Sequence, residues 1–155
     1  MLRLRGNSPA TVDDKGRLKL PASFKASLET YAREALDGRL HFYVTSFDGK
    51  HARLYPMPVW EEIEANLMKV PSTDPARRRF LEVTSYFGSE VELDVQGRFV
   101  IPPILRESAQ LSGGEVAILG QLNHLLLWNR MNFERKMAVE PLTDQDLSAL
   151  AEMGI

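Results

Sequence analysis

The sequence contains no cysteine among its 155 residues. This absence excludes disulfide bonds, thiolate zinc sites, iron–sulfur clusters and cysteine nucleophiles. The three histidines, His41, His51 and His124, do not have the spacing of metal ligands. We therefore expect no metal and no cofactor, and the composition is consistent with a reducing compartment.

Long apolar segments are also missing. The N-terminus lacks the roughly 7–15 apolar residues of a secretory signal, and no segment approaches the roughly 18 apolar residues of a membrane span. The longest candidate, 119–128, is interrupted by Gly120, Gln121, Asn123 and His124. These absences predict a cytoplasmic protein without a membrane partner. No phosphate-binding loop, nucleophile elbow or dinucleotide fingerprint is present, so we expect neither an enzyme nor a small-molecule substrate.

The overall charge is slightly acidic, but it is unevenly distributed. The net charge is −2 and the isoelectric point is about 5.9, whereas nucleic-acid-binding domains are usually basic. Residues 3–19 carry five basic and two acidic side chains, and residues 134–155 carry five acidic and two basic ones. The average therefore conceals a locally positive segment that could face an anion.

Two segments of the chain resemble each other. Residues 12–21 read VDDKGRLKLP and residues 93–102 read LDVQGRFVIP, at an offset of 81. In each, a glycine-containing turn follows an aspartate, and an alternating strand then runs to a proline. We predict a β-hairpin in each segment, the first with Leu18 and Leu20 on one face and Arg17 and Lys19 on the other. The positions shared by both copies are Asp13 and Asp94, Gly16 and Gly97, and Arg17 and Arg98.

The remaining pattern predicts an α+β protein in which the order of elements repeats. Helices are expected over 22–36, ending at Asp37-Gly38, and over 59–68, 75–87, 143–153 and short segments from 103 and 132. Strands are expected over 40–45, 52–55, 90–94, 98–101, 115–120 and 124–128. We interpret this order as a tandem duplication of one hairpin unit with flanking helices, related by a pseudo-two-fold axis. The predicted units are 1–70 and 71–140, followed by a C-terminal helix in 141–155.

The two Asp-x-x-x-Arg motifs, Asp13 to Arg17 and Asp94 to Arg98, resemble those of the MraZ family of transcriptional regulators. Residues 5–7 and 11–17 are also similar to the start of that family, and residues 94–102 are similar to AbrB-type swapped-hairpin DNA-binding domains. The resemblance covers residues 3–140. It implies an AbrB-like fold, a closed-ring homo-oligomer, and nucleoid-associated binding to repeated double-stranded DNA boxes in the promoter of the division and cell-wall gene cluster.

Arg17 is the candidate for a base contact, because its guanidinium fork can bind guanine O6 and N7 in the major groove. The predicted phosphate contacts are Lys15, Lys19, Arg3 and Arg5. Asp13, Gly16, Asp94 and Gly97 are predicted to shape the turns. For Arg98 we favour a structural role, held by Asp94, over a DNA contact, since the acidic side chains nearby in the sequence would repel phosphate.

Several features remain open to more than one interpretation. The arginine run 77–79 is expected on a solvent-exposed or subunit-facing helix surface, because successive helical residues point about 100° apart. The aromatic residues Tyr55, Trp60, Trp128 and Phe133 are expected in the core rather than stacked on bases. The alternative function is a ring-forming scaffold or an antitoxin-like interaction module without specific DNA binding. The C-terminal helix could pack on its own lobe, cap a ring or bind a partner.

Overall fold

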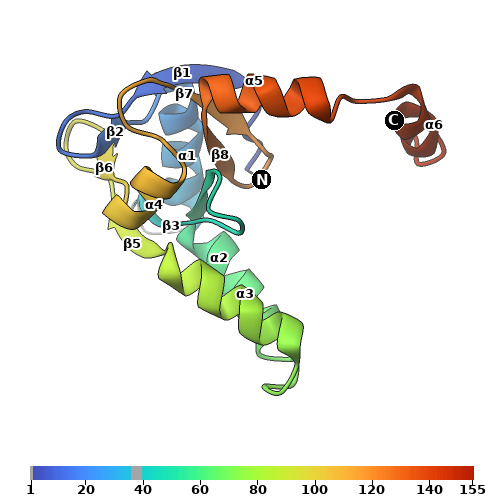
Figure 1. Ribbon diagram of the computed structural model, residues 1–155. Helices are drawn as coiled ribbons and strands as arrows, with labels where there is room; N and C mark the ends of the chain where they lie inside the picture. The colour runs from blue at the N-terminus through green and yellow to red at the C-terminus, as the bar shows by residue number, and fades with distance from the viewer. Residues whose placement is uncertain (1, 36–39) are drawn as a thin grey trace.

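The chain folds around one six-stranded antiparallel sheet, with a separate two-stranded sheet beside it (Figure 1). A computed structural model describes residues 2–35 and 40–155. The strands are β1 (Asn7–Thr11), β2 (Arg17–Lys19), β3 (His41–Thr45), β4 (Ala52–Pro56), β5 (Ser89–Glu92), β6 (Arg98–Val100), β7 (Glu115–Gly120) and β8 (Leu125–Asn129). The helices are α1 (Ala22–Ala35), α2 (Met57–Leu67), α3 (Pro75–Tyr86), α4 (Pro103–Ser108), α5 (Arg130–Val139) and α6 (Asp144–Ala151).

The predicted α+β class is confirmed, and every predicted helix and strand is present within a few residues of its expected position. The expected end of the first helix at Asp37-Gly38 lies outside the described residues. The large sheet has the order β1-β7-β8-β4-β3-β5, and the small sheet consists of β2 and β6. Strands from 1–70 and from 71–140 are therefore interleaved within shared sheets.

The predicted pairing of strands within each of the segments 12–21 and 93–102 is wrong. The turns themselves close, through backbone bonds from Asp13 N to Arg17 O at 2.9 Å and from Asp94 N to Arg98 O at 2.8 Å. Beyond the first turn only an isolated bridge between Val12 and Leu18 continues the local pairing. Strand β1 instead pairs with β7, from Asn7 opposite Leu119 to Thr11 opposite Glu115, and β2 pairs with β6. An isolated two-stranded hairpin is marginal in water, whereas the exchanged pairing allows both chain halves to cover one core.

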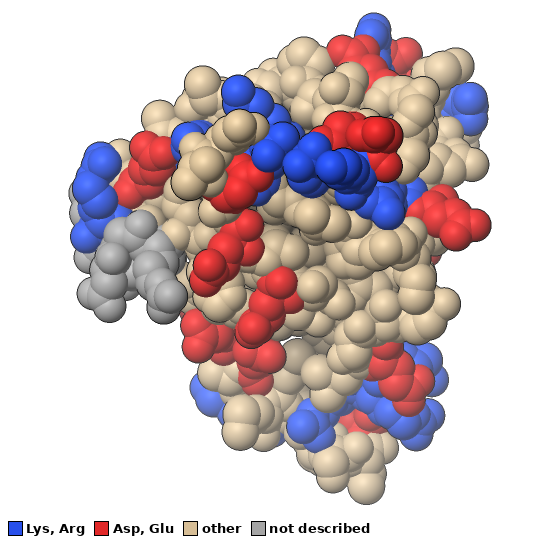
Figure 2. All heavy atoms as spheres, turned by 90° about the vertical axis from the view of Figure 1, so that its left-hand side faces the viewer, with Lys and Arg blue, Asp and Glu red and all other residues tan. Residues whose placement is uncertain are grey.

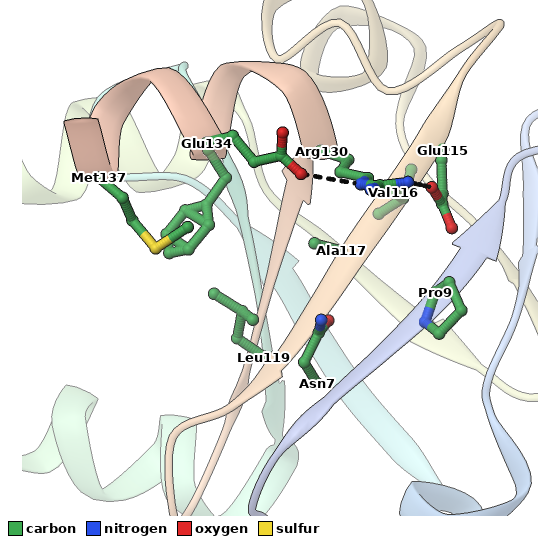
Figure 3. A pocket seen from close by; sticks show the side chains of 10 residues that line it. Asn7, Pro9, Glu115, Val116, Ala117, Leu119, Arg130, Glu134 and Met137 are labelled. Atoms are coloured by element: carbon green, nitrogen blue, oxygen red, sulfur yellow. Dashed lines mark hydrogen bonds and ion pairs between the residues drawn. The ribbon is translucent and has the colours of Figure 1, made fainter.

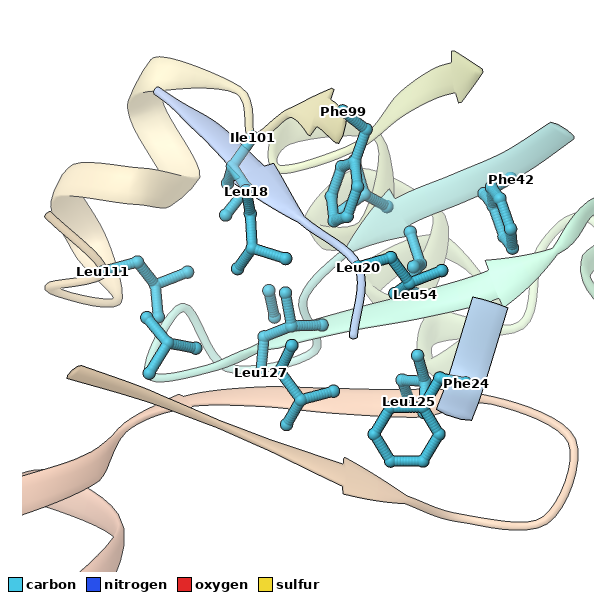
Figure 4. Packing of buried hydrophobic residues seen from close by; sticks show 14 of the residues in the cluster. Leu18, Leu20, Phe24, Phe42, Leu54, Phe99, Ile101, Leu111, Leu125 and Leu127 are labelled. Atoms are coloured by element: carbon cyan, nitrogen blue, oxygen red, sulfur yellow. The ribbon is translucent and has the colours of Figure 1, made fainter. Parts of the chain in front are cut away.

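That core lies between the inner face of the six-stranded sheet and the elements β2, β6, α1 and α4 (Figure 4). Leu18 and Phe99 face each other across the small sheet and are 0% and 2% exposed. Burying a side chain of this size contributes roughly 1.5–3 kcal/mol. The cluster also includes Leu20, Phe24, Phe42, Leu54, Ile101, Leu105, Leu111, Leu125 and Leu127.

The outer face of the sheet carries Tyr55 and Trp128 and is covered by α2, which includes Trp60, and by α5. Tyr55, Trp60 and Trp128 are all buried, which confirms their predicted packing. Phe133 is only half-buried, with its ring 5.4 Å from that of Trp128. Tyr55 stacks on His124 at 4.6 Å between ring centroids, and Trp128 stacks on His51 at 4.3 Å. Burial lowers the pKa of His51 and lowers the pKa of His124 to about 4, so both rings are neutral at neutral pH.

Candidate nucleic-acid interface

Each Asp-x-x-x-Arg motif forms a closed turn in which the aspartate binds the arginine that follows it. The Oδ1 atom of Asp13 accepts hydrogen bonds from the backbone nitrogens of Lys15 (3.0 Å) and Arg17 (2.8 Å). Its Oδ2 atom accepts the Nε–H of Arg17 at 2.8 Å. Gly16 closes the turn with a φ of +79°, a conformation that favours glycine.

The second turn repeats these bonds. Asp94 accepts backbone hydrogen bonds from Gln96 and Arg98, each at 2.9 Å, and the Nε–H of Arg98 at 2.9 Å. The backbone amides of Arg17 and Arg98 are the main reason why the pKa values of Asp13 and Asp94 are lowered. The stabilisation by these carboxylates is therefore complete at neutral pH and is lost only as the pH falls through their lowered pKa values.

The small sheet brings the two turns together. Arg17 lies opposite Val100, and Lys19 lies opposite Arg98. Main-chain bonds extend the pairing at both ends, from Leu20 N to Gly97 O at 2.9 Å and from Ile101 N to Gly16 O at 3.0 Å. Because side chains alternate along a strand, Arg17, Lys19 and Arg98 share the face opposite the buried Leu18 and Phe99. Arg98 thus lies beside Lys19 as well as beside Asp94, so the acidic residues near it in the sequence describe only part of its surroundings.

Both arginines are anchored in the same way. Their side chains are 30% and 26% exposed, for Arg17 and Arg98 respectively. Among the described residues, the hydrogen bonds of each guanidinium involve Nε alone. The aspartate therefore orients the guanidinium without occupying its two terminal nitrogens, which are the donors needed for bidentate binding. A structural role in the turn and a ligand contact are compatible.

Two further cations, Lys25 and Arg106, belong to this surface and were missed from the sequence. Arg106, on α4, packs against Gly16, where a Cβ atom would overlap its guanidinium. Lys25, on α1, packs against Gly97, where a Cβ atom would lie 3.3 Å from its Cδ. Lys25 and Arg106 are separated by the same offset of 81 as the motifs, and that offset is the signal that could have identified them.

These side chains form a surface that we call the basic belt. Figure 2 shows it as Lys and Arg side chains running across the face that carries β2 and β6, with acidic side chains on either side. Three carboxylates, Asp13, Asp14 and Asp94, belong to the same turns, and two of them are engaged in the turn hydrogen bonds. The belt comprises Lys15, Arg17, Lys19, Lys25, Arg98 and Arg106.

Arg3 and Arg5 are not part of the basic belt. Leu4, between them, pairs with Leu122 in the turn that joins β7 to β8. Strand β1, which spans about 17 Å, separates this position from the first turn (Figure 1). The expectation that Arg3 and Arg5 lie near Arg17 is therefore wrong, because pairing with β7 keeps β1 extended.

The contact between Gly16 and Arg106 predicts a measurable difference between two glycine substitutions. Gly16 and Gly113 have nearly the same φ, +79° and +78°, but no atom lies within 4 Å of a Cβ placed at Gly113. Gly113→Ala should cost about 1 kcal/mol from backbone strain alone. Gly16→Ala should cost about 1 kcal/mol more, because Arg106 must also move. Equal losses in urea unfolding would contradict this packing.

An apolar groove of about 570 Å³ lies between α5 and the strands β1 and β7 (Figure 3). Its walls include Pro9, Leu119, Phe133 and Met137. On its rim, Arg130 bridges Glu115 and Glu134, which raises the pKa of Arg130 through both carboxylates. Arg130 thus pairs with both carboxylates on the rim, and these three charges sum to −1.

The described residues contain neither a membrane-spanning helix nor a cluster of metal ligands. In the ranges 2–35 and 40–155, no helix combines the length and apolar character needed to cross a bilayer. Across the same ranges, no three His, Asp or Glu side chains gather closely enough to hold a metal ion.

Comparison with known proteins identifies the family of this chain. Residues 88–151 match the family model described as "MraZ protein, putative antitoxin-like". The chain is 46% identical to the Koribacter versatilis protein named transcriptional regulator MraZ, over 97% of this chain and 99% of that protein. The chain belongs to the MraZ family. MraZ of Acidobacterium capsulatum is 44% identical over 97% of this chain and 99% of its own length. MraZ of Coxiella burnetii is 40% identical over 84% of this chain and 82% of its own length.

The family membership confirms the resemblance seen in the two Asp-x-x-x-Arg motifs. The MraZ family model covers the second turn, β6 and α6, whereas the alignments with the MraZ relatives extend over nearly the whole chain.

Proposed function

We propose that this chain regulates transcription by binding double-stranded DNA through the basic belt. The observation that carries the proposal is the paired arrangement of Arg17 and Arg98. Both are anchored through Nε by an aspartate, and both lie on one exposed face of the small sheet. Relatives that align over the whole belt are named transcriptional regulators.

The two arginines are proposed to bind base edges and the surrounding cations to bind phosphates. A guanidinium fork offers two parallel donors to guanine O6 and N7, and its orientation is already set here by the aspartate. Lys15, Lys19, Lys25 and Arg106 would then position the duplex through phosphate contacts. The proposal includes Arg98, because Lys19 lies opposite it in the small sheet, and it omits Arg3 and Arg5.

The arrangement of strands supports an internal duplication with a pseudo-two-fold axis. The strands β1, β2, β3 and β4 correspond to β5, β6, β7 and β8. When each strand is replaced by its counterpart, the order β1-β7-β8-β4-β3-β5 is reproduced in the reverse direction, as a two-fold axis requires. The same correspondence relates Arg17 to Arg98 and Lys19 to Val100, so it converts the pair Arg17–Val100 into the pair Arg98–Lys19. We infer two AbrB-like units, 1–70 and 71–140, that swap strands within one chain.

A single belt on a chain of net charge −2 would give modest affinity. We therefore infer that several subunits bind several DNA boxes at once, as a homo-oligomer that closes into a ring. Tethered sites bind at high effective concentration, so repeated boxes raise the overall affinity without new contacts. The proposed targets are repeated boxes in the promoter of the division and cell-wall gene cluster, with association with the nucleoid as a consequence.

The dependence of binding on salt tests the proposal. A duplex box obtained by in vitro selection is titrated at several salt concentrations. Four phosphate contacts predict that log K falls against log salt with a slope of roughly −3 to −4. Removing two of these contacts in Lys15→Ala/Lys19→Ala should reduce the slope by about 2.

The result would also separate this function from its alternative. If no duplex is enriched by selection, or if binding does not change with salt, DNA regulation by the belt is contradicted. A scaffold or antitoxin-like interaction module would then account better for the fold.

A further inference from the structure

Helix α6 is an amphipathic segment that the other described residues, 2–35 and 40–143, do not bury. None of its residues is buried, and Figure 1 shows it standing away from the body beyond α5. Leu147, Leu150 and Met153 form an apolar side, and Leu147 and Met153 are 48% and 78% exposed. An isolated helix of eight residues is marginal in water even with the capping box at Thr143. Packing against another surface would stabilise it.

The same segment carries charge of only one sign. Residues 141–155 contain Asp144, Asp146 and Glu152 and no Lys or Arg. The backbone amide of Thr143 lowers the pKa of Asp146, which therefore remains ionised at neutral pH. A surface that receives α6 should thus combine an apolar groove with arginine or lysine.

The tip of the α2–α3 hairpin has both properties. A groove of about 330 Å³ between these helices is lined by Leu67, Val70, Ala76 and Phe80, together with Asp74 and Arg77. Arg78 and Arg79 are exposed beside it, and Arg78 is only weakly paired with Glu82, at 3.7 Å. Asp74 is occupied in capping α3 through the backbone nitrogen of Arg77. The Nε atom of Arg77 is buried without a hydrogen-bond partner in the described structure, and a carboxylate would supply one.

We propose that α6 of one chain docks on the α2–α3 tip of a second copy of this chain. The apolar side of α6 would enter the groove, and its carboxylates would meet the arginines of 77–79. The four residues between α5 and α6 span at most about 14 Å, and Figure 1 places α6 and the tip at separate ends of the molecule. A second copy therefore fits this contact better than the same chain does.

The contact joins two different surfaces, so each chain both donates a helix and receives one. Such a heterologous contact propagates from chain to chain and closes into a ring when the rotation between neighbours allows it. The inference rests on the proposed function, which requires an oligomer that presents several basic belts to DNA. The docking contact identifies the surfaces through which that oligomer would form.

Mixing two full-length variants tests the contact. Leu147→Asp/Leu150→Asp removes the apolar side of α6, and Arg78→Glu/Arg79→Glu reverses the charge beside the groove. Light scattering after gel filtration should show that each variant alone falls from the wild-type mass to that of one chain, 17.5 kDa. An equimolar mixture should form a complex of two chains and stop there, because only one functional pair of surfaces remains.

Arg3→Glu/Arg5→Glu is the charge-matched control, and it should keep the wild-type mass. If either docking variant keeps the wild-type mass, or if the mixture remains single chains, the docking proposal is overturned. Binding to one DNA box is measured on the same samples and should stay within twofold of wild type, because the basic belt is unchanged. Loss of assembly with intact DNA binding supports the docking surface. If no sample binds DNA, wild type included, the proposed DNA-binding function is contradicted, but the docking proposal is not.

Discussion

Replacing Arg17 with alanine should weaken binding to a single DNA box roughly 5- to 150-fold, the range expected for one bidentate base contact. Because Arg98 is held by Asp94 in the same geometry, Arg98→Ala should have an effect of similar size. The two losses should multiply in the double variant if the contacts are independent. Fluorescence anisotropy at one fixed salt concentration measures all three affinities.

Two control variants separate base recognition from charge. Arg17→Lys keeps the positive charge but loses the planar fork, so it should restore little of the lost affinity. Arg3→Ala/Arg5→Ala removes two charges from the other end of β1 and should change the affinity less than twofold. An unchanged affinity in Arg17→Ala, with the fold intact by thermal unfolding, would remove Arg17 from the interface. An effect of Arg17→Ala without one of Arg98→Ala would assign Arg98 to the turn alone.

A DNA fragment with several boxes should bind wild-type protein about 10²- to 10⁴-fold more tightly than a fragment with one box. The gain arises because a subunit next to one that is already bound meets its box at high effective concentration. Gel-shift titrations on fragments that differ only in the number of intact boxes provide the comparison. Scrambled boxes keep the length and total charge of the DNA constant.

The single-chain variant Arg78→Glu/Arg79→Glu serves as the control for this gain. It should bind fragments with one box and with several boxes at nearly the same affinity per box, since it cannot bridge boxes. If the wild-type protein also shows no preference for several boxes, the multivalent mechanism is wrong even where the basic belt itself binds DNA.

Features that depend on neighbours in the sequence were predictable. The glycines at 16 and 97 indicated tight turns, and the aspartates that close those turns bind residues only two and four positions away. Asp74 and Thr143 cap helices α3 and α6, and each accepts a hydrogen bond from the backbone nitrogen three residues further on. Such interactions form within one turn of chain, so their geometry follows from a few consecutive residues.

The partners of strands were not predictable in the same way. Ladder hydrogen bonds join backbone groups that every strand carries, so they do not by themselves distinguish β1 from β6 as the neighbour of β2. What distinguishes them is the burial of side chains far apart in the sequence, above all Leu18 against Phe99. The pairing then determines which charges are neighbours: it places Arg98 opposite Lys19 and separates Arg5 from Arg17 by the length of β1.

The sequence by itself therefore determined the two anchored arginines, because each Asp-x-x-x-Arg turn is a local structure. Only the tertiary structure decided that both turns, together with Lys25 and Arg106, form one cationic surface. The physical reason is that the exchanged strands bury a core shared by both halves of the chain, and this burial depends on contacts across some 80 residues of sequence.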